Sequence, residues 1–399
     1  MRILQVHTRY REPGGEESVV DAERSMLADN GFDVEQFVLH NDSMAPMSHL
    51  KMARTTVWNA AARRSIIQSI RAFRPDVVHV HNTFPLMSPA VISGARDCGA
   101  AIVQTLHNYR LVCPSATLFR DGQPCTLCVG RRVPWPAVVH RCYRGSAAAS
   151  ATVATMLVVH RLLKTYAEHV DRLIVLTEFA RQQFIAGGLA ANKLVVKPNA
   201  LAFDPGRGTG DGGYALFVGR LSPEKGVVEL LDAWRAQRPM VTLRIVGDGP
   251  LAEQVRSLAR NAGRVEVLGP LPRDQVFQQM QGAAVLLFPS RWFEGAPMTI
   301  IESFATGTPV IAIGLGAARE MVEDGVSGAL VEPGDYAALV AATVRLTGDL
   351  HTLSRMRERA RRAYERTHHA TTNVHRLSAI YESSRDRRGG RGAKHSGAS

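Results

Sequence analysis

The stretch FPSRWFEGAPMTIIESFATGTPVIA, residues 288–312, decides the fold. The apolar run that leads into it, Ala284–Phe288, predicts a buried strand that ends in a loop. Pro297 stands where a helix is expected to begin, because proline is favoured at the first helical position. The first N–H groups of that helix, at Met298 and Thr299, have no intrahelical partners and form a ready anion site. The stretch therefore predicts a strand–loop–helix unit that binds an anion.

Two carboxylates flank the start of this helix. Glu294 lies in the loop, and Glu302 follows eight positions later in an early helical turn. Taken alone, they could be a solvated loop residue and a favourable charge near a helix N-terminus. Because they accompany an anion-binding helix start, the sequence favours a role in ligand binding for both.

A second charged loop stands upstream, in FVGRLSPEKG, residues 217–226. An apolar run enters Gly219, and Arg220 and Lys225 follow in the loop. A guanidinium offers two planar hydrogen bonds and an ammonium a compact charge, a pair of groups that suits a diphosphate. A Gly-Asp-Gly-Pro turn after the next apolar run, beginning at Gly247, fits a turn near a base or ribose.

The chain carries two series of short apolar runs that alternate with helical patterns, which favours parallel βαβ units. The predicted fold class is α/β, with two tandem Rossmann-like domains and a ligand cleft at the carboxyl ends of their strands. The domains are expected over residues 1–196 and 214–365, with a Pro/Gly-rich linker at 197–213. A C-terminal helix at 366–384 and a disordered basic tail at 385–399 complete the chain.

These motifs together resemble glycosyltransferase family 4, whose fold is the arrangement called GT-B. The resemblance covers about residues 1–365. It rests on the pair Glu294/Glu302 with SFATGTPVIA after it, on Gly219-Arg220 with Lys225-Gly226, on Lys197-Pro198-Asn199 in the linker, and on Gly14-Gly15-Glu16-Glu17. Each motif alone is weak, whereas the combination is specific.

The resemblance implies transfer of a sugar from a nucleotide diphosphate-sugar with retention of anomeric configuration. It implies that Arg220 and Lys225 hold the diphosphate, that Glu302 binds the ribose and that Glu294 contacts the donor sugar. No cofactor or divalent metal is expected for the chemistry. The implied donor site is completed by Gly14, Gly15, Gly219, Gly247, Gly295, Pro297, Met298 and Thr299.

Histidines end two of the predicted strands. His107 follows the run Ala101–Thr105, and the family has a matching histidine that faces the donor sugar. By that resemblance His107 would bond the sugar or assist the acceptor proton. His79 and His81 end the preceding strand, and a structural role is the alternative for all three.

Four cysteines, Cys113, Cys125, Cys128 and Cys142, lie in a loop-like insertion at residues 113–142. Four thiolates that include one Cys-x2-Cys pair suit a structural zinc ion. Unligated thiols and disulfides are the alternatives.

The charge is unevenly spread. The chain has 48 Lys and Arg against 36 Asp and Glu, a net charge of +12, and the excess lies in residues 43–75, 351–384 and 385–399. Residues 63–74 form an amphipathic pattern with a basic face, which predicts either an ordinary surface helix or a patch for an anionic membrane. No nucleic-acid-binding motif accompanies the charge, so nucleic acid is not expected as a partner.

The sequence therefore predicts a retaining glycosyltransferase that acts on a glycan or lipid-linked hydroxyl acceptor, in polysaccharide, glycolipid or cell-envelope biosynthesis. A nucleotide-sugar isomerase or epimerase on the same double-Rossmann scaffold is the alternative. With no apolar run long enough to span a bilayer and no cleavage signal in MRILQVHTRY, a cytoplasmic location is expected, with the inner membrane face as an option. The motifs do not specify the nucleotide, the sugar, the acceptor or the linkage.

Overall fold

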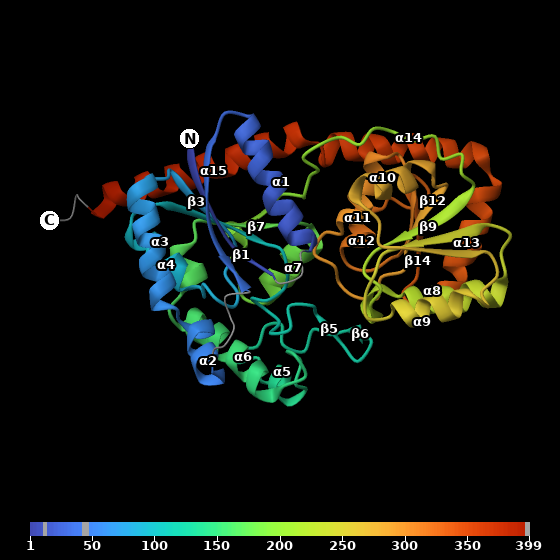
Figure 1. The fold of residues 1–399 in the computed structure, drawn as a ribbon. Helices are drawn as coiled ribbons and strands as arrows, with labels where there is room; N and C mark the ends of the chain where they lie inside the picture. Colours follow the sequence, from blue (N-terminus) through green and yellow to red (C-terminus); the bar gives the residue numbers. More distant parts are fainter. Residues whose placement is uncertain (11–13, 42–47, 396–399) are drawn as a thin grey trace. The chain divides into compact units, whose positions relative to one another are not determined.

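The computed structural model describes residues 1–10, 14–41 and 48–395. They form two compact units (Figure 1), each described here by itself. Unit 1 comprises Met1–Leu118, Thr126–Ala202 and Ala370–Ser399, and unit 2 comprises Phe119–Cys125 and Phe203–His369. Within the described residues, no helix is both long enough and apolar enough to cross a membrane.

Unit 1 is built on a six-stranded parallel sheet in the order β2-β1-β3-β4-β7-β8. Its inner strands are buried along their whole length, as expected when helices cover both sides of a parallel sheet. The strands are β1 (Arg2–Arg9), β2 (Asp33–His40), β3 (Val77–Asn82), β4 (Ala101–Leu106), β7 (Arg172–Val175) and β8 (Leu194–Val196).

The helices of unit 1 bury apolar stripes at helical spacing. Helix α3, for example, turns Ile66, Ile70 and Phe73 inward, as its sequence pattern predicts. The helices are α1 (Gly15–Asp29), α2 (His49–Val57), α3 (Ala60–Phe73), α4 (Ala90–Asp97), α5 (Trp135–Val139), α6 (Ala147–Leu162), α7 (Glu178–Ala186) and α15 (Ala370–His395).

Unit 2 repeats the plan with a parallel sheet in the order β11-β10-β9-β12-β13-β14. Its core includes Trp234 of α8, which has no solvent-exposed area. The strands are β9 (Tyr214–Val218), β10 (Thr242–Val246), β11 (Val265–Gly269), β12 (Val285–Phe288), β13 (Val310–Ile313) and β14 (Gly328–Val331). A two-stranded antiparallel hairpin, β5 (Phe119–Arg120) and β6 (Gln123–Pro124), is grouped with this unit.

The helices of unit 2 are α8 (Val227–Gln237), α9 (Ala252–Ala259), α10 (Arg273–Gly282), α11 (Met298–Ala305), α12 (Ala317–Met321), α13 (Tyr336–Gly348) and α14 (Leu350–Thr367). Both sheets thus have the α/β architecture expected from the alternating pattern.

The C-terminal segment belongs to unit 1. Helix α15 packs Leu377, Ile380 and Tyr381 into the apolar core beside β1, β3 and β4. The backbone is helical to His395, whereas the sequence predicted a disordered tail from residue 385. The prediction of disorder rested on basic composition, which does not by itself prevent a helix from extending by further turns. Residues 396–399 lie outside the described part of the chain.

In each sheet the strand order reverses direction at one place, between β1 and β3 in unit 1 and between β9 and β12 in unit 2. Loops at the carboxyl ends of strands diverge there and leave room for a ligand. The Gly14-Gly15 motif follows β1, the Arg220–Lys225 loop follows β9 and the Glu294 loop follows β12, while His107 and Gly247 follow the neighbouring strands β4 and β10.

Candidate functional site

In unit 2, the loops after β9 and β10 lie directly against each other. The N–H of Leu221 donates to the carbonyl of Asp248 at 2.8 Å. A Cβ on Gly247, whose φ is +139°, would stand 1.9 Å from the carbonyl oxygen of Gly219. This position therefore requires glycine, which gives the predicted donor-site residue Gly247 a structural role whatever it binds.

The loops after β9 and β12 also converge. Lys225 Nζ lies 2.7 Å from Glu294 Oε1, and Ser290 Oγ donates to the same oxygen at 2.8 Å. Lys225 Nζ also lies 5.7 Å from the ring centroid of Trp292. Two charged motifs that are 69 positions apart in the chain thus form one cluster.

Arg220 lies on the same loop as Lys225, and its side chain is exposed. Gly226 turns the chain into α8 in a left-handed conformation, φ +71°, where a Cβ would lie 2.1 Å from the carbonyl oxygen of Pro289. Because these two backbones lie so close together, the loop that runs from Arg220 to the start of α8 has little room to change its conformation.

Helix α11 begins at Met298, one residue later than predicted, because Pro297 occupies the cap position. The N–H groups of Met298 and Thr299 stand in its first turn, where a helix has no intrahelical acceptors. Gly295 lies in the loop before it, and the helix dipole adds partial positive charge at this end.

Glu302 lies one turn into α11, with 18% of its side chain exposed. Burial raises its pKa to about 7, although Arg273 Nη2 at 3.5 Å acts in the opposite direction. A carboxyl held in this range changes charge near neutral pH, which an exposed glutamate does not do.

In unit 1, the end of β1 is joined to the first turn of α1. Gly14 caps α1 and Gly15 is its first residue, with open space where a Cβ on Gly14 would stand. Glu17 Oε1 accepts from the N–H of Tyr10 at 2.6 Å, so this carboxylate links the residue after β1 to α1.

Glu16 is a candidate that sequence reasoning missed. Its Oε2 accepts from Tyr10 Oη at 3.2 Å and from Asn108 Nδ2 at 3.4 Å, next to His107. Burial raises the pKa of Glu16 to about 7. Glu16 occupies the variable position of the Gly-Gly-x-Glu motif, so the motif does not single it out. Its contact with Asn108 spans 92 positions of the chain, which no local sequence pattern reveals.

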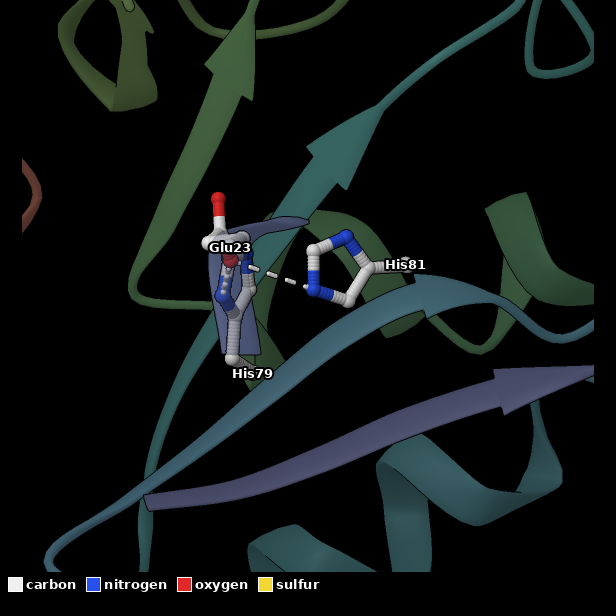
Figure 2. A group of neighbouring side chains, drawn as sticks. All are labelled: Glu23, His79 and His81. Atoms are coloured by element: carbon white, nitrogen blue, oxygen red, sulfur yellow. Dashed lines mark ion pairs between the residues drawn. The ribbon is translucent and has the colours of Figure 1, made fainter. Parts of the chain in front are cut away.

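His107 belongs to a chain of buried polar groups. His81 Nδ1 lies 3.0 Å from His107 Nε2, and His81 Nε2 lies 3.3 Å from Glu23 Oε1 (Figure 2 shows the Glu23 end of this chain). Burial holds the pKa of His107 well below its usual value, so this imidazole is neutral.

Glu23 is the charged group of this chain. Burial works to raise its pKa, but His79, Lys197 and His81 together hold it well below its usual range. The carboxylate is therefore ionised, and the His81 ring lies between it and His107.

His79, His81 and Glu23 offer three ligand atoms within 4.8 Å of one another (Figure 2). However, Lys197 Nζ lies 3.3 Å from Glu23 Oε2, where it opposes a second cation. Both nitrogens of His79 are also engaged, Nε2 with Thr105 Oγ1 and Nδ1 with Tyr381 Oη, each at 2.8 Å. The cluster fits a proton-sharing network better than a metal site, and His79 has the structural role that the sequence left open.

The structure does not support the predicted zinc site. Within the described residues, no three of the sulfurs of Cys113, Cys125, Cys128 and Cys142 come together at metal-binding distance. Cys113 Sγ instead lies 3.1 Å from Ser115 Oγ, and Cys125 follows the β5–β6 hairpin, which packs with unit 2 rather than unit 1. Among the described residues, the structure forms no disulfide between cysteines.

Two family models match the chain, and together they cover most of it. The model described as "Glycosyl transferase 4-like domain" matches residues 14–200, and "Glycosyl transferases group 1" matches residues 212–349.

Among curated proteins, the chain is 25% identical to O-antigen chain mannosyltransferase C of Escherichia coli, over 92% of this chain and 94% of that protein. It is 34% identical to exopolysaccharide phosphotransferase SCO2592 of Streptomyces coelicolor, but the match spans only 48% of this chain and 21% of that relative. Among solved structures, Anabaena Alr3699/HepE in complex with UDP superposes with a TM-score of 0.69 at 19% identity, over 96% of this chain and 100% of that chain. At this identity the structural match shows the fold.

The buried pair of Glu23 and Lys197 generates a stability prediction. Glu23→Gln leaves the Lys197 ammonium buried without its counter-charge, and we expect a loss of about 3–5 kcal/mol in the free energy of unfolding. Calorimetry of the thermal transition in which unit 1 unfolds measures this loss. The double variant Glu23→Gln/Lys197→Met should recover part of the loss.

Glu168→Gln serves as the matched control, because it breaks an exposed Glu–Lys pair with Lys164 in the same unit and should leave unfolding unchanged. A single Glu23→Gln variant as stable as the parent chain would contradict the assignment of a buried ion pair.

The raised pKa of Glu302 generates a prediction of pH dependence. Its folded-state pKa of about 7 exceeds its ordinary value of 4.5 in an unfolded chain, so the folded chain binds the proton more tightly. The free energy of unfolding should therefore fall as pH rises from 4.5 to 7 and remain lower above pH 7. Glu302→Gln removes this cost, and we expect it to stabilise the chain at pH 8 by on the order of 1–3 kcal/mol but not at pH 4.5.

Unfolding curves at the two pH values test this, with Glu253→Gln on α9, whose side chain is 91% exposed, as the control. An equal effect of Glu302→Gln at both pH values would refute the assigned burial cost.

Proposed function

Because this chain belongs to glycosyltransferase family 4, with two parallel-sheet domains of the GT-B type, we propose that it transfers a sugar from a nucleotide diphosphate-sugar to a hydroxyl acceptor with retention of configuration. The observation that carries the proposal is the convergence of Lys225 and Glu294 at 2.7 Å, at the edge where β9 and β12 diverge and α11 begins. This arrangement brings an ammonium, a carboxylate and a helix N-terminus to one place, and a donor with a diphosphate and sugar hydroxyls needs all three.

The diphosphate is the leaving group of this reaction. As the bond between the sugar and the phosphate lengthens, negative charge grows on the departing oxygen. Arg220, Lys225 and the N–H groups of Met298 and Thr299 would stabilise that charge. In this proposal Gly219, Gly247, Gly295 and Pro297 shape the loops, and the close packing of Gly247 against the backbone of Gly219 supports that role for these two.

The two glutamates would bind hydroxyl groups of the donor. Glu302 is assigned to the ribose, which requires its carboxylate form for the strongest acceptance of hydrogen bonds. Glu294 is assigned to the sugar, and its contact with Lys225 would rearrange as the diphosphate takes over the ammonium.

Unit 1 would contribute the groups that meet the acceptor. His107, whose Nε2 lies 3.0 Å from His81 Nδ1, is assigned to the sugar or to the acceptor proton. Glu16, next to Asn108 and with a pKa of about 7, is a second candidate to receive that proton. Gly14 and Gly15 would let a ligand approach the start of α1.

The acceptor is proposed to be a growing glycan or a lipid-linked sugar. The names of the relatives support this class, since they include an O-antigen chain mannosyltransferase and an exopolysaccharide phosphotransferase. We also propose a cytoplasmic enzyme that works at the inner face of a membrane. The nucleotide-sugar isomerase alternative receives no support, because the matched relatives are transferases.

Arg220→Ala tests the donor assignment. We expect kcat to fall roughly 100-fold, which is the scale of losing one preorganised charge donor. The assay screens UDP-, GDP- and ADP-sugars for release of the nucleotide diphosphate and determines the anomeric configuration of the product by NMR. Arg235→Ala, which removes a half-exposed arginine on α8, is the matched control and should keep the parental kcat.

An Arg220→Ala enzyme with near-normal kcat would overturn the assignment. Conversion of the nucleotide-sugar without release of nucleotide diphosphate would instead favour the isomerase.

A further inference from the structure

The large apolar side chains that unit 1 exposes are not scattered. Among the described residues of this unit, all of them lie in two segments, residues 50–58 and 127–163. Leu162 is 77% exposed and Trp135 is 53% exposed. Single exposed apolar residues are ordinary, whereas a group confined to one part of a surface indicates an interaction site.

Direct contacts join the two segments into one surface. The ring of His160, near the end of α6, stacks on Trp58 with centroids 5.8 Å apart, and its Nε2 lies 2.9 Å from the carbonyl oxygen of Val57. The neighbouring Arg161 donates to the carbonyl of Arg131 at 2.6 Å. Figure 1 shows α2, α5 and α6 gathered at one end of unit 1.

We call this surface the apolar–basic face. Its apolar side chains are Trp58, Leu127, Val133, Trp135, Leu162 and Leu163. Its exposed cations are Arg131, Arg132, Arg141, Arg144 and Lys164.

Acidic residues are missing from the sequence of the face. Residues 48–58 and 126–167 contain eight Lys and Arg and no Asp or Glu. At least one of the cations lies against an apolar group, since the Arg131 guanidinium is 5.4 Å from the ring centroid of Trp135. A protein interface excludes charges from its apolar centre, whereas the boundary between headgroups and acyl chains accepts indole rings and cations side by side.

A hollow of about 370 Å³ lies among the same elements. Leu111, Leu157 and Leu189 line it, and Arg131, Arg132 and Lys164 stand at it as well. An apolar recess beside cations has the chemistry that an acyl chain and its phosphate require.

We infer that the apolar–basic face is a docking surface for an anionic lipid bilayer. Trp58, Trp135 and Leu162 would enter the boundary between headgroups and acyl chains, while the arginines bind lipid phosphates. The inference concerns where the enzyme binds rather than what it transfers, so it does not depend on the donor chemistry.

The amphipathic helix α3, which the sequence singled out, offers charge without this apolar component. Ile66, Ile70 and Phe73 are buried against the unit, and Arg63 is paired with Asp97. It therefore provides a matched comparison on the same unit.

The experiment is flotation of the full chain with vesicles of phosphatidylcholine, with and without phosphatidylglycerol. We expect binding to the anionic vesicles that falls with added salt. Arg132→Gln/Arg141→Gln/Arg144→Gln should weaken it about 100-fold, since each of the three charges near such a surface contributes about fivefold. Arg64→Gln/Arg71→Gln/Arg74→Gln removes the same charge from the α3 region, where all three arginines are exposed, and should change binding much less.

A second readout reports the depth of the indoles. Lipids brominated on their acyl chains should quench the fluorescence of the chain, and Trp135→Phe should remove part of that quenching while the chain still floats. Thermal unfolding of each variant establishes that it is folded.

The inference is overturned if the parent chain does not bind anionic vesicles, if the α3 variant loses binding as strongly as the face variant, or if bound chain shows no quenching. None of these measurements uses a nucleotide-sugar, so failure of the docking surface and failure of the proposed transfer are distinguishable.

Discussion

The carboxylate of Glu23 is the charge around which unit 1 is organised. It is 3% exposed, and a buried ion is tolerable only where opposite charge and hydrogen bonds surround it. Lys197 supplies the charge from 174 positions away, and Asn373 of α15 accepts from the same ammonium at 2.8 Å. Helix α1, the linker and α15 must therefore come together for the carboxylate to have its ion-pair and hydrogen-bond partners. This gives a physical reason why α15 packs on the first unit.

The same carboxylate connects stability to chemistry. Glu23 contacts His81, and His81 contacts His107, so the charge that holds the elements together is one histidine ring away from a candidate site residue. In unit 2 the ion pair is less deeply buried, since 21% of the Lys225 side chain and 12% of the Glu294 side chain are exposed. A pair that ligand phosphates must reach cannot be buried as deeply as one that organises a core.

Sequence reasoning succeeded where the signal is local. The strand–loop–helix units around residues 217–226 and 288–312 are encoded by apolar runs, glycines and a proline within about 25 positions, and the structure forms them with a shift of one residue at the start of α11. Glu16, Glu23 and Lys197 were not identified as a buried polar system, because their environments arise from contacts across 92 and 174 positions. The cysteine spacing misled for the same reason: it is a local pattern, and the hairpin between Cys113 and Cys128 packs with the other unit.

The net charge of the chain acquires a meaning only when apolar exposure is considered with it. The basic stretch at 43–75 divides in the structure, so that Lys51 and Arg54 on α2 lie beside the apolar–basic face, while four arginines belong to α3 and its C-terminal cap. Charge alone attracts a chain to any anionic surface and is screened by salt, whereas exposed indole and leucine side chains discriminate a bilayer from a polyanion. A transferase whose acceptor is lipid-linked needs both properties on the unit that meets the acceptor. Residues 48–58 and 126–167, which contain no Asp or Glu, combine them.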